Sequence, residues 1–166
     1  MNQEYEELLD QYLELPARLD EATNGLAKED FDLRLEGEWS IREYICHLID
    51  GEQLWQINLR VILGLNGAAF PMTWYPQHSQ MEWSALWAYS KRSIEALLDQ
   101  YRANTQSLVD ILENLPDEVW EYFGRITWPG AEKESRYSVR DIVEMHISHL
   151  DGHAQDIRAI RAKHGR

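Results

Sequence analysis

The chain has 166 residues and a net charge of −13, from 29 acidic and 16 basic side chains. This balance argues against binding to nucleic acids or to anionic membranes, because both need basic patches. A single cysteine, Cys46, excludes an intrachain disulfide and suits a reducing cytoplasm. No apolar run approaches the roughly 20 residues of a membrane span, and the acidic N-terminus is unlike a signal peptide. We therefore expect one cytoplasmic domain over residues 1–166.

Residues 3–24 carry apolar side chains at helical spacing and predict a first helix. Pro16 lies inside this pattern, and we expect it to kink the helix or to divide it into two pieces. Asn24 and Gly25 are typical of a helix end. A connector follows before the second helix.

Residues 40–63 predict the second helix, which begins with a capping box formed by Ser40 and Glu43. His47 shares a face with several apolar side chains of this helix and should therefore point inward. Glu43 and Asp50 lie one turn on either side of His47, and either could orient its imidazole by accepting the second N–H. Gly51 is unusual in mid-helix, and it would leave room beside His47 for an ion, a substrate or a neighbouring helix.

Residues 64–80 form a loop that is rich in glycine, proline and aromatic side chains. This loop is long for a helix bundle, so it is either functional or poorly ordered. If it is functional, Trp74 and Tyr75 would shape the wall of a pocket.

Residues 82–115 predict the third helix, and Pro116 ends it. The following stretch is irregular. Residues 125–128 and 135–137 within it are compatible with a short hairpin.

Residues 138–163 predict the last helix, with His146, His149 and His153 inside its apolar stripe. An imidazole buried without a hydrogen bond or a metal costs about 1–3 kcal/mol. The three are therefore either core histidines bonded to carbonyls or carboxylates, or metal ligands of the kind that project into helix bundles. His149 can share an ion with either neighbour, whereas His146 and His153 lie about 10 Å apart along the axis.

Four long amphipathic segments predict an all-α fold, a four-helix bundle with long connectors between helices two and three and between helices three and four. His47 with His149 and His153 would supply three neutral nitrogens and leave a coordination position open. Such a set suits Zn, Ni, Fe or Cu rather than Mg or Ca. An open site is the catalytic arrangement, because the ion lowers the pKa of a water or a thiol.

Two segments, WSIREYICHLIDGE (39–52) and SVRDIVEMHISHLDGHAQDI (138–157), resemble the signature segments of the DinB/YfiT-like superfamily. The resemblance implies a four-helix bundle with a metal held by three histidines. By this resemblance His47 is the ligand from the second helix, and His149 and His153 are the pair from the last helix.

One part of the last segment departs from the family pattern. Members usually have a second histidine directly beside the last ligand and a glutamine three residues further on. Ala154, Gln155 and Asp156 stand there in this chain, so the groups behind the ligands differ.

The resemblance also implies a function, because characterised members include thiol transferases that use bacillithiol, mycothiol or glutathione. The first expectation is a divalent-metal-dependent thiol S-transferase acting on small electrophiles, with Zn or Ni as the ion and Fe as a further option. From their positions beside His47, Glu43 and Asp50 are the candidate catalytic residues, and either would support a ligand or accept a proton. The alternatives are a metal-dependent hydrolase with the same ligands, or a non-catalytic metal-binding or dimerisation module. The expected partners are a small-molecule substrate and a second copy of the chain.

Overall fold

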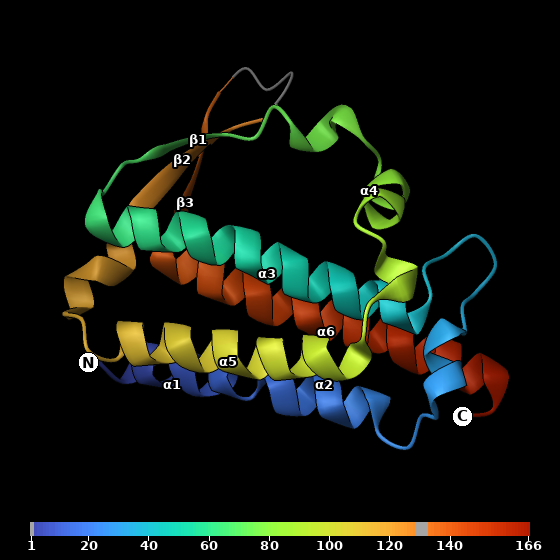
Figure 1. Cartoon of the computed structure of the whole chain (residues 1–166). Coiled ribbons are helices and arrows are strands. Elements are labelled where there is room, and N and C mark those ends of the chain that lie inside the picture. The colour runs from blue at the N-terminus through green and yellow to red at the C-terminus, as the bar shows by residue number, and fades with distance from the viewer. Residues whose placement is uncertain (1, 129–132) are drawn as a thin grey trace.

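The computed structural model of the chain describes residues 2–128 and 133–166, and within them it is a four-helix bundle with a small sheet on one side (Figure 1). The α3 helix contacts α5 and α6, and the α1–α2 pair contacts the same two helices. The bundle helices are α1 (Gln3–Leu13) and α2 (Leu15–Thr23), α3 (Ile41–Gly64), α5 (Ile94–Leu112) and α6 (Val139–His164). The predicted all-α class and bundle architecture are confirmed.

The first predicted helix is divided at the position where proline was expected to break it. The α1 helix ends at Leu13, and Pro16 occupies the first turn of α2. Proline is tolerated there because the first backbone N–H groups of a helix have no partner within it. The α1–α2 pair therefore acts as one helix of the bundle.

Capping boxes fix the first turns of α3 and α6, the two helices that carry the inward histidines. Glu43 accepts from the Ser40 backbone N–H at 2.8 Å, and Asp141 accepts from the Ser138 backbone N–H at 2.7 Å. In each case the serine hydroxyl accepts from the backbone N–H of the acidic residue. Each box satisfies N–H groups that the helix itself leaves unpaired, so the start of each helix is sharply defined.

The third helix was predicted as one element from residue 82, and this is wrong because the structure interrupts it over residues 87–93. The chain forms a short helix, α4 (Gln80–Leu86), leaves helical geometry, and begins α5 only at Ile94. Ala88 adopts a left-handed conformation with φ of 53°, which ends α4. Ser93 then caps α5 by accepting from the Ala96 backbone N–H at 3.4 Å.

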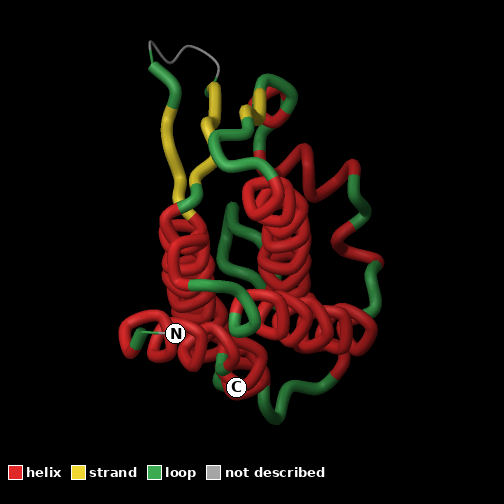
Figure 2. Tube along the Cα trace, turned by 90° about the vertical axis from the view of Figure 1, so that its left-hand side faces the viewer, coloured by secondary structure: helices red, strands yellow, loops and turns green. Residues whose placement is uncertain are grey.

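The sheet consists of β1 (Ala69–Pro71), β2 (Phe123–Thr127) and β3 (Ser135–Ser138), in that spatial order. The β2 and β3 strands are antiparallel, which confirms the predicted hairpin, and β1 adds to β2 in parallel. Both views place the sheet beside α3, on the side away from α1 and α2 (Figures 1 and 2). Gly124 allows this close approach, because a Cβ atom there would lie 2.8 Å from Ile62 Cδ1.

The core lies between the bundle helices and is built from their apolar stripes. Its fully buried large side chains come from every helix of the bundle. They include Tyr12, Leu19, Ile45, Ile49, Leu108, Leu112, Leu150 and Ile157. Short 3-10 turns lie in the described parts of the connectors: η1 (Lys28–Asp32), η2 (Tyr75–Gln77), η3 (Tyr89–Lys91) and η4 (Asp117–Glu121). Among the described helices, none is long and apolar enough to cross a membrane.

Candidate metal centre

Three imidazoles from two helices meet in the bundle. His47 comes from α3, and His149 and His153 come from α6. The Nε2 atom of His149 lies 3.0 Å from Nε2 of His47 and 3.1 Å from Nε2 of His153. One ring nitrogen from each residue lies within 4.8 Å of the other two. The sequence spacing allowed His149 to share an ion with either His146 or His153. In the structure, its Nε2 atom lies beside that of His153.

The surroundings of His47 and His149 favour neutral rings. Burial, together with the neighbouring His149 and His153, lowers the pKa of His47 to about 3. Burial also lowers the pKa of His149 to about 4, again with a contribution from His153. A neutral imidazole is the form that binds a metal, because its unprotonated nitrogen carries the lone pair.

The donor set fits a divalent transition ion. Two imidazole nitrogens that share an ion at about 2.0–2.1 Å lie roughly 3 Å apart, as the closest pairs of Nε2 atoms do here. Without an ion, lone pairs at these distances repel, and a hydrogen bond can satisfy only some of them. Three nitrogen donors select Zn, Ni, Fe or Cu over Mg or Ca.

Asp156 holds the second nitrogen of His153. Its Oδ2 atom lies 2.9 Å from His153 Nδ1, one turn further along α6. Because a carboxylate accepts, this contact puts the proton on Nδ1 and leaves Nε2 free for the cluster. In the sequence, Asp156 stands out only as a departure from the family pattern. Its three-residue separation from His153 on one helix was the signal that could have identified it.

Two aromatic side chains pack against the rings of His47 and His153. The Trp39 ring lies 4.7 Å from the ring of His47, and the Tyr44 ring lies 5.1 Å from that of His153, measured between centroids. Both aromatic residues are buried. They exclude water from one side of the cluster and restrict the orientation of its imidazoles.

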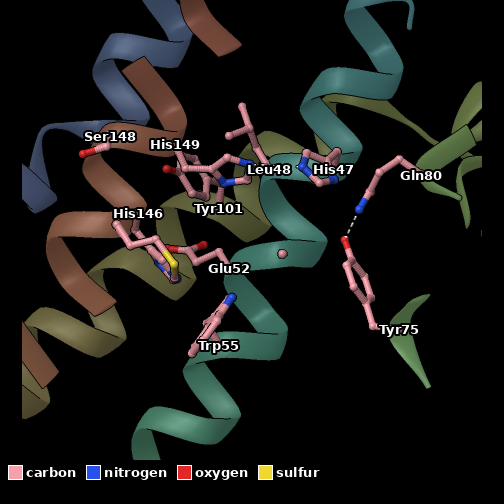
Figure 3. A pocket seen from close by; sticks show the side chains of 12 residues that line it. His47, Leu48, Glu52, Trp55, Tyr75, Gln80, Tyr101, His146, Ser148 and His149 are labelled. Atoms are coloured by element: carbon pink, nitrogen blue, oxygen red, sulfur yellow. Dashed lines mark hydrogen bonds between the residues drawn. The ribbon is translucent and has the colours of Figure 1, made fainter. Parts of the chain in front are cut away.

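A cavity of about 540 Å³ opens beside the cluster, and His47 and His149 form part of its wall (Figure 3). Tyr75 and Gln80 lie at its outer side, where the Gln80 amide donates to the Tyr75 hydroxyl at 2.6 Å. The loop that was expected to shape a pocket therefore contributes Tyr75 to this cavity. A small molecule could thus reach the imidazoles from this side.

The inner end of the cavity contains two buried polar side chains, Glu52 from α3 and His146 from α6, which reach toward each other (Figure 3). The Tyr12 hydroxyl donates to Glu52 Oε1. Among the described residues, Glu52 Oε2 and both ring nitrogens of His146 have no hydrogen-bond partner. Burial raises the pKa of Glu52 to about 7 and lowers that of His146 to about 3. Sequence reasoning missed Glu52, which lies five residues after His47 on the cavity side of α3.

Glu43, one of the two predicted catalytic residues, is engaged in the cap of α3. Its Oε2 atom accepts from Ser40 and lies 3.3 Å from Arg34 Nη2, while Oε1 accepts from Ser84 of α4 at 3.2 Å. Burial raises the pKa of Glu43, but the hydrogen bonds from Ser40 and the charge of Arg34 outweigh it and lower the pKa overall. This carboxylate therefore ties α3 to the connectors around it.

Asp50, the other predicted catalytic residue, pairs with the Arg92 guanidinium at 2.6 and 2.7 Å. This contact joins α3 to the segment before α5. In the described part of the chain, neither Glu43 nor Asp50 forms a hydrogen bond with His47, so neither accepts its second N–H as was expected. Catalytic roles for the two carboxylates stay a prediction.

Comparisons with known proteins gave a family match and a structural match for this chain. A model of the DinB superfamily matches residues 11–157. Among solved structures, the chain is similar to YfiT from Bacillus subtilis, with 17% sequence identity and a TM-score of 0.83. The match covers 99% of this chain and 90% of that one, which is described as "a probable metal-dependent hydrolase with an unusual four-helix bundle topology". No curated protein matches the chain.

Proposed function

Because the chain belongs to the DinB superfamily, we propose that it is a metal-dependent hydrolase of a small-molecule substrate. One observation carries this proposal: three Nε2 atoms from two helices converge beside a cavity of about 540 Å³. A closed structural site would have a fourth protein ligand, whereas three histidines beside a cavity match the open catalytic arrangement. The description of YfiT as a metal-dependent hydrolase supports the same reading.

In this proposal His47, His149 and His153 hold a divalent ion, with Zn or Ni as the first choice. When bound, such an ion lowers the pKa of a water molecule and supplies a nucleophile near neutral pH. Asp156 fixes the ring of His153 and keeps its Nε2 unprotonated. Trp39 packs against the ring of His47 and keeps water from that face of it, and the cavity beside the cluster is the route by which substrate would enter.

Thiol transfer, the first expectation from the sequence, becomes the second candidate. The cavity lining argues against an anionic thiol, because no lysine or arginine stands among the described residues that form it. Bacillithiol and glutathione both carry carboxylates, and burying a carboxylate without a cationic partner is unfavourable. The cavity also argues for a substrate rather than for a purely structural or dimerising role.

Metal content tests the ligand set. We expect about one transition metal ion per chain after mild purification, measured by plasma mass spectrometry. His149→Ala should lose the ion, because it removes the nitrogen that lies closest to both others. His164→Ala is the matched control, since its ring contacts the Arg34 carbonyl outside the cluster. A wild-type protein that holds no metal and gains no thermal stability from Zn or Ni would exclude the proposal.

A second experiment separates hydrolysis from thiol transfer. The zinc-loaded protein is incubated with a panel of esters, amides and electrophilic substrates, with and without each low-molecular-weight thiol. Hydrolysis predicts that substrate consumption does not depend on the thiol and that water is incorporated into the product. Consumption only in the presence of a thiol, with a thioether product, would favour the transferase instead.

A further inference from the structure

An apolar groove of about 280 Å³ adjoins the cavity beside the histidine cluster. Gly51, Trp55 and Tyr75 line both spaces, so the two form one continuous surface. The groove runs along the side of α3 that faces the sheet. A molecule whose reacting group lay at the histidines could therefore extend into this groove.

The walls of the groove are aromatic and uncharged. Its main side chains are Trp55 of α3, Phe70 of β1, Met72 and Trp74 in the connector after β1, and Trp128 after β2. Among the described residues that line it there is no lysine, arginine, aspartate or glutamate. Apolar ligand surface gains free energy on entering such a space, whereas a charged group would lose its hydration without finding a partner.

The aromatic wall is held in place by its own contacts. The Trp74 ring lies 5.4 Å from that of Tyr75 and 5.7 Å from that of Trp83, with both pairs edge-on. The Trp83 indole N–H donates to the Tyr75 carbonyl at 2.8 Å. A wall fixed in this way is already shaped for a ligand, which reduces the entropy lost on binding.

The adjoining cavity, like the groove, has no cationic side chain among the described residues that line it. Glu52 is the only carboxylate among the described residues that line the cavity, and no cationic side chain accompanies it there. The continuous surface thus offers aromatic contacts and hydrogen-bonding groups, but no cationic side chain for an anion.

We propose that the substrate carries an uncharged apolar tail of aromatic size, which lies in this groove while its reacting group lies at the histidine cluster. This inference rests on the proposed function, because the cluster must act on the other end of the same molecule. It excludes substrates whose tail ends in a carboxylate or a phosphate.

Three hydroxamates with different tails test the inference, because a hydroxamate head binds a metal ion and places the tail beside it. The probes are acetohydroxamate, 4-phenylbutanohydroxamate and the monohydroxamate of adipic acid, titrated calorimetrically into the full zinc-loaded chain. We expect the phenyl probe to bind at least about tenfold more tightly than acetohydroxamate. The adipate probe should bind no more tightly than acetohydroxamate, because its carboxylate finds no cation in the groove.

Substitutions in the groove test where the tail of the phenyl probe binds. Trp74→Ala and Trp128→Ala each remove one wall of the groove and should reduce the advantage of the phenyl probe to about threefold or less. Leu86→Ala is the control, because Leu86 is an exposed apolar residue that lines neither space. It should leave the ratio of the two dissociation constants unchanged. Circular dichroism and zinc content confirm that each variant is folded and loaded.

The outcomes separate this inference from the function on which it rests. Zinc binding with equal affinity for all three probes would overturn the apolar-tail inference and leave the metal centre intact. A phenyl advantage that survives both tryptophan variants would overturn the assignment to this groove. A chain that binds no zinc fails before any probe is added, and that result overturns the proposed function and the inference together.

Discussion

The contact between His153 and Asp156 orders one of the three imidazoles through its far nitrogen. Asp156 lies on the surface side of α6, and its Oδ2 atom is 2.9 Å from His153 Nδ1. Such a carboxylate fixes both the tautomer and the orientation of a ligand ring. It is the only carboxylate among the described residues that forms a hydrogen bond with a ring of the cluster.

Removal of this carboxylate should therefore weaken the metal site without unfolding the protein. We expect Asp156→Ala to lower zinc affinity by about 10- to 100-fold, with Asp156→Asn in between. Competition with a fluorescent chelator measures the affinity. Asp151→Asn is the control on the same helix, because Asp151 pairs with Arg18 instead. Equal zinc affinity in wild type and Asp156→Ala would rule out a supporting role for Asp156.

Glu52 makes the stability of the metal-free protein depend on pH in an unusual direction. Burial raises its pKa to about 7 from an ordinary value of 4.5. Its contribution is therefore fully present below pH 4.5 and is lost as the pH rises through 7. His47, His146 and His149 act in the opposite sense, because their lowered pKa values make the protein less stable as the pH falls below 6.5.

Comparison with Glu52→Gln isolates the glutamate, since the histidine contribution is common to both proteins. Glutamine keeps an acceptor for the Tyr12 hydroxyl and removes the titration. Between pH 5 and pH 8, wild type should lose up to about 3 kcal/mol of unfolding free energy relative to the variant. Urea denaturation with a chelator present, repeated across this range, gives the difference. Two parallel curves would show that Glu52 does not titrate in this window.

Among single residues, the sequence identified the inward histidines but not the groups around them. His47, His149 and His153 were found because helical periodicity turns each side chain toward the core. Their role as ligands stays a prediction, although their ring nitrogens do meet. Glu52 was missed because its burial depends on Tyr12 of another helix. No pattern within one segment reveals such a contact.

Among the elements, α3 carries a glycine in its middle, where it faces both the cavity and the groove. A Cβ atom at Gly51 would meet only His149 Cε1, at an ordinary contact distance of 3.7 Å. One methyl group therefore fits beside the cluster. The flexibility of glycine destabilises the interior of a helix by about 0.5–1 kcal/mol relative to alanine.

Gly51→Ala should accordingly stabilise the metal-free protein by about 0.5–1 kcal/mol in urea denaturation. Gly152→Ala in α6 is the matched control, because nothing lies within 4 Å of a Cβ atom there. The two substitutions should give similar gains. A loss of stability in Gly51→Ala alone would mean that the space beside His149 does not accept even a methyl group.

The helix boundaries show which local signals were sufficient. Pro16 marks the start of α2, and serine caps mark the starts of α3 and α6. Each of these signals lies within a few residues of the helix start that it marks. The break between α4 and α5 was missed because the apolar spacing continues across it and no glycine or proline marks it. Ala88 takes the positive φ instead. The β1 strand was missed because it pairs with β2, more than fifty residues away.

Across the whole molecule, two electrostatic effects oppose each other. The net charge of −13 destabilises the compact state through repulsion, whereas ion pairs between elements stabilise it. Arg102 joins α5 to Asp20 of α2 at 2.8 Å, and Arg140 joins α6 to Glu4 of α1 at 2.6 Å. These pairs are largely exposed, and such pairs contribute only about 0–1 kcal/mol each.

Repulsion should therefore dominate, and added salt should stabilise the protein. Raising NaCl from about 10 mM to about 300 mM at pH 7.5 shortens the screening length from about 30 Å to below 10 Å, so distant like charges are screened more than paired ones. We expect the melting temperature of the metal-free chain to rise. Arg102→Ala, which removes an ion pair and makes the charge more negative, should melt lower and gain more from salt. A melting temperature that falls with salt would show that the ion pairs outweigh the excess of negative charge.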